Sequence, residues 1–210
     1  MADEMTETKE RIFDTFIDMI SVSGYENVSM REIAKNVGIN SASIYHHYKS
    51  KDKILEHIYE YFDEHYYMNR PSVEEVERIV ETGDAAQIIG ALHRSFETDD
   101  YKVYVRMIKI NRIIYMRLFQ DMAATAMFAR HNDQETDYVV EILQHGIDIG
   151  RIDPDFDTRT YAIMLIGVMV SMAMNAYSDP NYGVGEVDIR GSILAVHAKL
   201  LSSVLHDPKE

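Results

Sequence analysis

The sequence has no cysteine and no tryptophan, and only 4 prolines and 10 glycines among its 210 residues. Without cysteine there can be no disulfides, thiolate nucleophiles or Cys-based zinc and iron–sulfur sites. The first residues also lack the basic and apolar regions of a signal peptide, so we expect a protein of the reducing cytoplasm. The low proline and glycine content, with 46% apolar and 27% charged residues, excludes collagen-like and disordered chains and indicates a substantial core.

Positive charge is scarce as well. The chain carries 21 Lys and Arg against 35 Asp and Glu, a formal charge of −14. Such a molecule cannot attract nucleic acid or an anionic membrane as a whole, so any DNA contact must be local. One uncharged stretch, residues 160–178, contains Gly167, Ser171 and Asn175 and has no basic flank. We expect it to form a helix buried on two sides rather than a membrane span.

Alternating strand patterns are not found, whereas apolar residues recur at helical spacing throughout the chain. We therefore predict an all-α fold. Capping residues at Ser29, Ser50, Ser72 and Asp157 mark helix starts, because their side chains can accept hydrogen bonds from free backbone N–H groups. The predicted helices are residues 8–23, 30–37, 41–47, 51–67, 72–82, 85–96, a region 101–149 broken once near Tyr115, 158–178 and 187–205.

One short segment has the opposite charge to the rest of the chain. Residues 28–54 hold five Lys or Arg and two Asp or Glu, so they carry +3 and leave −17 elsewhere. Within them, two short predicted helices are joined at Gly38. This is the layout of a helix-turn-helix, whose second helix fits a DNA major groove about 12 Å wide. The charge asymmetry places DNA on this face.

The same residues carry a family resemblance. Gly24-Tyr25, residues 29–39 and residues 43–55 follow one another as in the TetR/AcrR family of bacterial transcriptional regulators, which the chain resembles over about residues 9–58. The resemblance implies a three-helix DNA-binding domain followed by a larger helical domain for ligand binding and dimerisation. We place the domains at residues 1–50 and 51–210.

By the same resemblance, the recognition helix presents short side chains to base edges, and its neighbours grip phosphates. Ser41 and Ala42 cannot read adenine or guanine in two-pronged fashion, so readout would depend on Arg31, thymine methyl groups, water and DNA shape. Tyr45 has the alternative of being a packed aromatic residue. The predicted DNA-binding residues are Arg31, Ser41, Ala42, Ser43, Tyr45, His46, His47 and Lys51.

The central helices are rich in methionine and aromatic residues. Methionine fills irregular space and aromatic rings form broad walls, so this composition suits an adaptable, largely apolar ligand. Each such residue could equally be ordinary core. We predict an effector site between residues 51–67 and residues 96–127, with Phe62, Tyr66, Tyr104, Met107, Asn111 and Met122 as contacts.

Metal and catalytic sites have little support in the sequence. His57, Tyr61 and His65 share a helix face at spacings of four, but the two histidines are two turns apart, too far to share one ion without other ligands. We expect them to be solvated surface histidines. No phosphate loop, nucleophile elbow or His-Glu-x-x-His motif occurs, so we predict no metal, cofactor or catalytic residues.

The last two predicted helices resemble half of a four-helix bundle. Apolar residues repeat at spacings of three and four on both, and a second chain would explain why residues 160–178 are apolar almost all round. An intramolecular core is the alternative. The predicted dimerisation residues are Leu165, Met169, Met172, Ile193, Leu200 and Val204.

These features together predict a cytoplasmic homodimeric transcriptional regulator. We expect it to act as a repressor that binds a palindromic operator and is released by a small, largely apolar effector, without membrane association. The family resemblance implies that the effector swings the fourth helix and changes the separation of the two recognition helices. The alternative is an all-helical enzyme or ligand-binding protein that does not read DNA.

Overall fold

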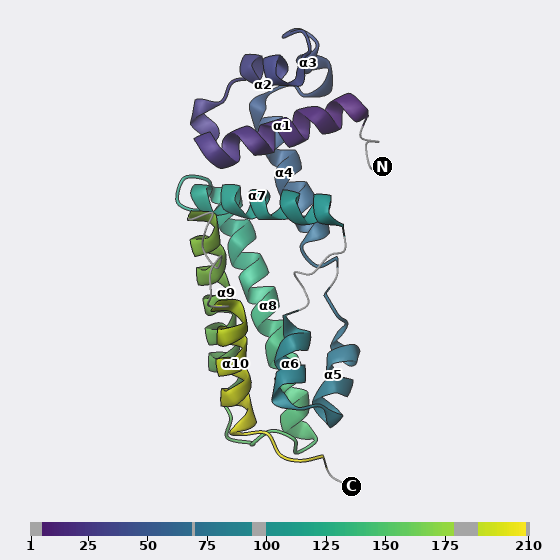
Figure 1. Cartoon of the computed structure of the whole chain (residues 1–210), viewed down its shortest axis with the longest axis vertical. Coiled ribbons are helices and arrows are strands. Elements are labelled where there is room, and N and C mark those ends of the chain that lie inside the picture. Colours follow the sequence, from purple (N-terminus) through teal and green to yellow (C-terminus); the bar gives the residue numbers. More distant parts are fainter. Residues whose placement is uncertain (1–5, 69, 94–99, 179–188, 209–210) are drawn as a thin grey trace. The chain divides into compact units, whose positions relative to one another are not determined.

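The computed structural model describes residues 6–68, 70–93, 100–178 and 189–208, and for Met169 and residues 172–178 and 189–190 it describes the backbone alone. The described residues are helical, as predicted, apart from turns and one isolated bridge between Ile152 and Leu205 (Figure 1). The helices are α1 (Glu7–Ser23), the 3-10 turn η1 (Tyr25–Asn27), α2 (Met30–Val37), α3 (Ile44–His47), α4 (Lys51–His65), α5 (Val73–Thr82), α6 (Ala85–Leu92), α7 (Tyr101–Arg117), α8 (Met122–Asp148), α9 (Thr158–Ser178) and α10 (Ile189–Ser202).

The helix starts that depend on capping residues are confirmed. Ser29, Ser50 and Ser72 each accept a hydrogen bond from the backbone N–H three residues later. Asp157 does the same for Thr160, with N and Oδ1 2.9 Å apart. These caps satisfy backbone donors that have no partner within the helix, so local sequence alone determines where these helices begin.

Several helix boundaries differ from the prediction; α4, for example, ends at His65 rather than at residue 67. The break in residues 101–149 lies at residues 118–121 rather than near Tyr115, because Asp121 caps α8: its Oδ1 accepts from the backbone N–H of Ala123 at 2.9 Å. The last helix ends at Ser202, before the expected residue 205. Its predicted start at residue 187, and the predicted end of α6 at Phe96, lie outside the described residues.

The chain divides into two compact units. Unit 1 comprises Met1–Met68 and Thr98–Thr125, and unit 2 comprises Asn69–Glu97 and Ala126–Glu210. In unit 1, α1 packs against α2, α4 and α7. Its buried side chains, among them Phe13, Phe16 and Ile17, form the centre of this unit. The predicted division at residue 50 concerns function and stays a prediction.

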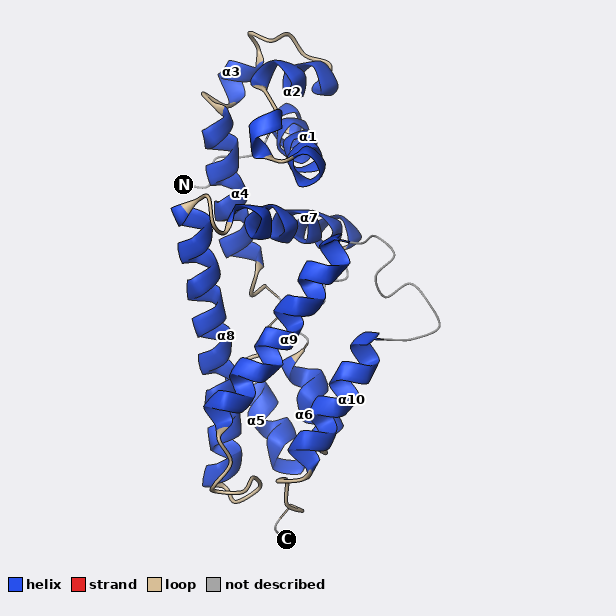
Figure 2. Cartoon of the chain, turned by 90° about the vertical axis from the view of Figure 1, so that its left-hand side faces the viewer, coloured by secondary structure: helices blue, strands red, loops and turns tan. Residues whose placement is uncertain are grey.

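Unit 2 is built on an apolar core to which α5, α6, α8, α9 and α10 contribute (Figure 2). Ile88, Val139, Ile142 and Leu143 are among its fully buried members. Arg151 is buried beside this core, where its guanidinium donates to the carbonyl oxygens of Val80 at 3.1 Å and Gly83 at 2.6 Å. It thereby satisfies the last carbonyls of α5, which have no partner within the helix.

One ion pair of unit 2 involves a buried carboxylate. Glu135 lies on the buried face of α8, with Oε1 3.4 Å from Nη1 of Arg70. The guanidinium of Arg70 also lies 4.5 Å from the ring centroid of Tyr138. Burial raises the pKa of Glu135, since it disfavours the charged form more than Arg70 favours it.

The uncharged helix α9 was the sequence's one candidate for a membrane span. In the part of the chain that the structure describes, no helix combines the length and the apolar character needed to cross a membrane. Tyr161, Ala162 and Leu165 of α9 are buried in the core of unit 2.

Candidate nucleic-acid interface

The two helices of the predicted DNA-binding motif, α2 and α3, are joined as a helix-turn-helix. A capping box opens α2: the backbone N–H of Ser29 donates to Glu32 Oε2 at 2.8 Å, and the N–H of Glu32 donates to Ser29 Oγ at 3.3 Å. Gly38 closes α2 with φ at 79°, in the left-handed region that glycine adopts without strain. Glu32 is therefore a capping residue, as its spacing from Ser29 predicts.

The recognition helix is shorter than predicted. It begins at Ile44 rather than at residue 41, because Asn40 Oδ1 accepts from the N–H of Ala42 at 2.8 Å and holds a turn there. Ser43 N–H then donates to the Asn40 carbonyl oxygen at 2.9 Å. Ser41, Ala42 and Ser43 thus lie in this turn, directly before the helix.

The outward face of this motif carries the predicted DNA-binding side chains. Ile44 and Tyr48 point into the core and are buried. Five of the eight predicted residues are exposed, and Ser43, His47 and Lys51 are half-buried. The exposed ones are Arg31, Ser41, Ala42, Tyr45 and His46.

Lys51, at the start of α4, already has protein partners. Its ammonium donates to the backbone carbonyl of Tyr25 at 2.8 Å and lies 4.0 Å from the centroid of the Tyr25 ring. An ammonium has three N–H donors, so two are left for a phosphate oxygen. The predicted phosphate contact of Lys51 stays a prediction, and Tyr25 fixes the position from which it would be made.

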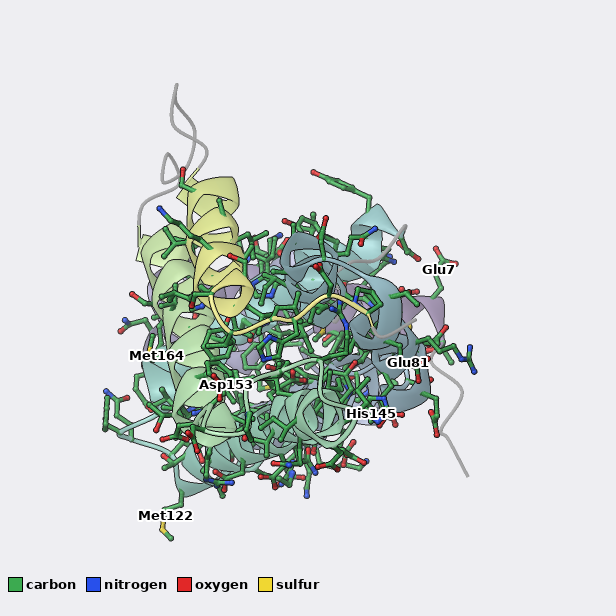
Figure 3. All side chains as sticks on the ribbon, turned by 90° about the horizontal axis from the view of Figure 1, so that it is seen from below. Glu7, Glu81, Met122, His145, Asp153 and Met164 are labelled. Carbon is green, nitrogen blue, oxygen red and sulfur yellow. The ribbon has the colours of Figure 1, made fainter. Side chains whose placement is uncertain are left out.

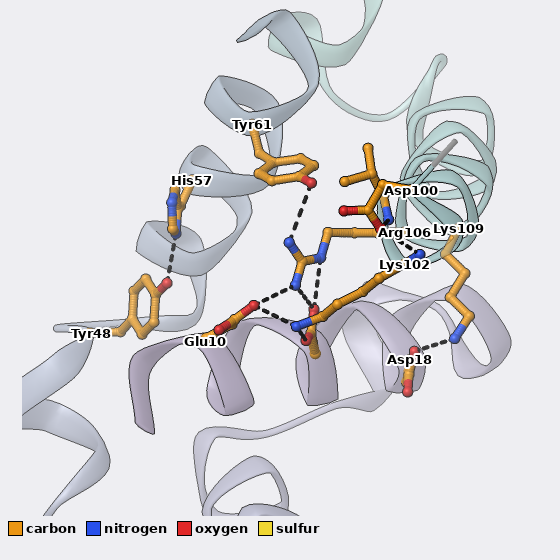
Figure 4. Close-up of polar contacts among 11 residues, drawn as sticks. Glu10, Asp18, Tyr48, His57, Tyr61, Asp100, Lys102, Arg106 and Lys109 are labelled. Carbon is orange, nitrogen blue, oxygen red and sulfur yellow. Dashed lines mark hydrogen bonds and ion pairs between the residues drawn. The ribbon is translucent and has the colours of Figure 1, made fainter. Parts of the chain in front are cut away.

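The expectation of solvated histidines on α4 is wrong. His57 is half-buried, with its Nδ1 2.6 Å from the hydroxyl of Tyr48 and its ring 4.5 Å from that of Phe13 (Figure 4). His65 is also half-buried and stacks on Tyr61, with 3.7 Å between ring centroids. Both differ from the prediction because α1 and α7 cover this side of α4. Within the described residues, no three His, Asp or Glu side chains form a possible metal site.

A row of ion pairs attaches α7 to α1, and the sequence did not predict it. Three carboxylates of α1 face three cations of α7, and we call this row the α1–α7 ion-pair ladder (Figure 4). The distances between N and O are 2.5 Å for Lys102 and Glu10, 2.6 Å for Arg106 and Asp14, and 2.6 Å for Lys109 and Asp18. The acidic residues recur every fourth position on α1, and that spacing was the one signal in the sequence.

Arg106 is the buried centre of the ladder. It is 8% exposed, and its Nη2 also lies 3.1 Å from Glu10 Oε1. Its Nη1 donates to the hydroxyl of Tyr61 on α4 at 3.2 Å. Arg106 is thus the contact that joins α1, α4 and α7. Hydrogen bonds from Lys102 and then Arg106 lower the pKa of Glu10.

The predicted effector residues all lie in unit 1 but do not all line one interior space. Phe62 is buried, and Tyr66, Met107 and Asn111 are half-buried. Asn111 donates its side-chain amide to the Met107 carbonyl oxygen on its own helix at 3.1 Å. Tyr104 is 45% exposed and Met122 is 89% exposed, and Met122 projects from the ribbon in Figure 3. These last two positions do not suit a closed pocket.

The predicted dimerisation residues lie on both sides of α9 and α10. Leu165 belongs to the core of unit 2, Ile193 and Val204 are partly buried, and Leu200 is 43% exposed. The side chains of Met169 and Met172 lie outside the described residues. Among the described side chains of these helices, further large apolar ones are exposed, and helical spacing alone does not say which face the core covers. They are Ile163, Met164 and Val196.

The geometry of α2 and α3 defines a helix-turn-helix protein, and comparisons with known proteins show which family this region is similar to. Residues 12–58 match the family described as bacterial regulatory proteins, tetR family. The HTH-type transcriptional repressor KstR2 of Mycolicibacterium smegmatis is 23% identical over 152 residues, 71% of this chain and 69% of that protein. The helix-turn-helix region of the chain therefore matches the tetR family, and the chain is a DNA-binding transcriptional regulator similar to members of that family.

Of two further matches, one covers about a quarter of the chain and the other covers nearly all of its fold. IcaR of Staphylococcus epidermidis, a negative transcriptional regulator of the biofilm operon icaADBC, is 36% identical over 58 residues, 26% of this chain and 31% of its own. The ketosteroid transcriptional regulator KstR2 of Mycobacterium tuberculosis has a fold with a TM-score of 0.62 at 19% identity, covering 98% of this chain and 99% of that one. The matches favour a regulator over a helical enzyme or ligand carrier that does not read DNA.

Proposed function

We propose that the protein is a cytoplasmic homodimeric repressor, which binds a palindromic operator and releases it when a small, largely apolar effector binds. The observation that carries the DNA-binding part is the exposure of the predicted side chains on α2, on α3 and in the turn between them, which are Arg31, Ser41, Ala42, Tyr45 and His46. This region carries local positive charge in a chain of −14, so DNA is directed to it.

Exposed apolar side chains support the dimer. Ile163 and Met164 of α9 and Val196 and Leu200 of α10 are exposed in a single chain, Val196 to 58%. A second copy of the same two helices would cover them in a four-helix arrangement. A dimer with two recognition helices reads two half-sites about 34–36 Å apart, or a further turn of the duplex away.

The effector is the least constrained part of the proposal. Phe62, Tyr66 and Met107 supply apolar and aromatic surface near the helix-turn-helix. The solved structure of similar fold is named for a ketosteroid, an apolar molecule with few polar groups, which is the class that this surface suits. An inducer of this kind must bind the free dimer more tightly than the DNA-bound dimer.

The DNA-binding part is tested by selecting duplexes from a random pool with the full-length protein at about 100 mM salt. We expect a palindromic sequence to be enriched. Lys51→Ala should remove one phosphate contact per subunit and lower the slope of log affinity against log salt by about 1.8 per dimer. Lys53→Ala is the matched control, because the Lys53 ammonium is paired with Glu56. If no duplex is enriched, the protein does not act as a DNA-binding repressor.

The dimer is tested separately by sedimentation at micromolar concentration. Leu200→Asp places an unpaired charge on the proposed interface and should give a folded monomer, since Leu200 is exposed in the single chain. Ser203→Asp adds the same charge at an exposed position near the end of α10 and should leave the dimer intact. Monomeric unaltered protein would rule out the four-helix interface.

The effector site is tested by Met107→Trp. If Met107 lines the proposed site, the larger ring should occupy part of it and weaken the response to any small molecule that co-purifies with the protein. Operator affinity should stay largely unchanged, because Met107 lies outside the helix-turn-helix. A full response to the small molecule in this variant would show that the effector binds elsewhere in the protein.

A further inference from the structure

Tyr25 is the point at which the start of α4 meets the end of α7. Its carbonyl accepts from Lys51, and its hydroxyl donates to the carboxylate of Asp52. The guanidinium carbon of Arg117, the last residue of α7, lies 4.3 Å from the centroid of the same ring. The ring of Phe16 on α1 packs edge-on against it, at 6.2 Å between centroids. All of these residues lie in unit 1.

Arg117 is itself held firmly. Its Nε and Nη2 both lie 3.1 Å from Oδ2 of Asp121, and the hydroxyl of Tyr59 on α4 donates to that same oxygen at 2.8 Å. The side chains of Arg117 and Asp121 are only 12% and 16% exposed. A guanidinium bound through two nitrogens has a fixed orientation, so the Tyr25 ring rests against a rigid surface.

The backbone before Tyr25 is also shaped for this contact. Gly24 has φ at 81°, a conformation that other residues adopt only with strain. A Cβ at this position would lie 3.8 Å from the terminal methyl carbon of Met116 on α7. The turn between α1 and η1 therefore runs directly beside the end of α7.

We propose that Arg117 is a positioning residue for DNA binding: it holds Tyr25, and Tyr25 holds the Lys51 ammonium where an operator phosphate would meet it. This inference rests on the proposed function, because it assumes that Lys51 contacts the operator. It adds a route of regulation, in which a small displacement of the end of α7 withdraws a phosphate contact while the recognition helix itself stays intact.

The physical reason is the flexibility of lysine. A free lysine side chain loses rotamer entropy when it is fixed against a phosphate, whereas one already held by a carbonyl and an aromatic ring loses less. The two cations, Lys51 and Arg117, can share one ring because Asp52 and Asp121 balance their charge. Without Arg117 the ring loses one of its two cationic partners, and the position of Lys51 becomes less defined.

The test is a double-mutant cycle on operator affinity, measured by anisotropy with the duplex selected by the unaltered protein, at low salt. Arg117→Ala should weaken binding about three- to tenfold when Lys51 is present, as expected for coupled neighbours, and less than about twofold in the Lys51→Ala background. Lys109→Ala is the matched control, since it removes a cation from the same helix without touching Tyr25. Its effect should be the same factor in both backgrounds.

Equal factors for Arg117→Ala in both backgrounds, or no loss of affinity at all, would overturn the proposal. If Arg117→Ala fails to fold by circular dichroism, Arg117→Lys replaces it, because lysine keeps the charge but not the flat two-nitrogen contact with Asp121. It should show the same dependence on Lys51 with a smaller factor. Absence of any duplex that the unaltered protein binds would instead refute the proposed function.

Discussion

The two units of the chain are held together by different kinds of contact. In unit 1, α7 is attached to α1 by the α1–α7 ion-pair ladder, with Arg106 buried at its centre. In unit 2, α5, α6, α8, α9 and α10 share an apolar core, beside which Arg151 and Glu135 are buried. Ion pairs are directional and depend on salt and pH, whereas apolar burial depends on neither to the same degree.

This difference suits the two regions to different tasks. An apolar core tolerates small shifts of its helices, because dispersion and hydrophobic contacts have no strict direction. The hydrogen bonds of a paired guanidinium weaken strongly when it moves by about an ångström. They therefore constrain the position of one helix relative to the other. The ladder thus fixes α7 to α1, which in turn packs against α2.

The largest effect that we expect comes from the core of unit 2. Ile142→Ala removes a fully buried side chain from α8 and should lower the free energy of unfolding by about 2–5 kcal/mol. Ile142→Val is the control and should cost only about 0.5–1.5 kcal/mol. Urea denaturation followed by circular dichroism measures both. The loss should be nearly the same in 0.1 and 1 M salt, and a strong salt dependence would contradict the comparison.

The second effect concerns the centre of the ladder. Arg106→Ala leaves Asp14, Glu10 and the Tyr61 hydroxyl without their shared donor, and should cost about 2–3 kcal/mol, less than for a fully buried pair because the carboxylates are partly exposed. Arg112→Ala, on the same helix but outside the ladder, should cost well under 1 kcal/mol. Equal losses from the two variants would mean that the ladder does not fasten α7.

The third effect is the pH dependence of stability, which we expect to have opposite signs for Glu10 in unit 1 and Glu135 in unit 2. The lowered pKa of Glu10 means that its stabilisation is present at neutral pH and is lost as pH falls below 4.5, its ordinary value, and through the folded pKa. The raised pKa of Glu135 means that the folded state takes up a proton more readily than the unfolded state. Unit 2 therefore gains stability from Glu135 as pH falls from 7 towards 4.5.

Two variants separate these contributions. The cost of Glu10→Gln should be greatest near pH 7 and shrink in acid, whereas Glu135→Gln should become relatively more favourable as pH rises. Urea denaturation between pH 4 and 7 gives the difference in unfolding free energy for each. Parallel pH profiles for the two variants would show that burial does not govern Glu135.

The smallest effect is expected at the outer end of the ladder. The side chains of Lys109 and Asp18 are 38% and 59% exposed, so Lys109→Ala should cost about 0.2–1 kcal/mol in 0.1 M salt. The cost should fall further in 1 M salt, where the screening length is about 3 Å. Lys35→Ala, an exposed lysine of α2, serves as the control. A cost as large as that of Arg106→Ala would mean that the burial of an ion pair does not determine how much it contributes to stability.

What the sequence could predict was set largely by the distance over which each contact acts. Ser29 and Glu32 are three residues apart, so their capping box could be read directly from the chain. Arg106 and Asp14 are 92 residues apart, and nothing local says that their helices meet. The regular acidic spacing on α1 does not identify a partner helix.

The candidate site shows the same limit at shorter range. The predicted start of the recognition helix was three residues early, because the Asn40 side chain competes for the backbone N–H of Ala42. Lys51 was predicted from the basic segment and from a family resemblance, while its bond to Tyr25 depends on how η1 folds back beside α4. Likewise Leu165 and Leu200 share an apolar pattern, and only the packing of unit 2 separates the buried side chain from the exposed one.

The graded burial of the ladder bears on how such a regulator can change over evolution. Its outer pair, Lys109 with Asp18, is exposed enough for either partner to be replaced at little cost, and the two charges of this pair can also be exchanged, whereas Glu10 is held by Arg106 as well as by Lys102. Arg106 allows no such freedom. Substitutions at such exposed pairs can therefore change the strength of the attachment between α7 and α1 in small, separate steps. The predicted operator-facing residues and the core of unit 2 need not change.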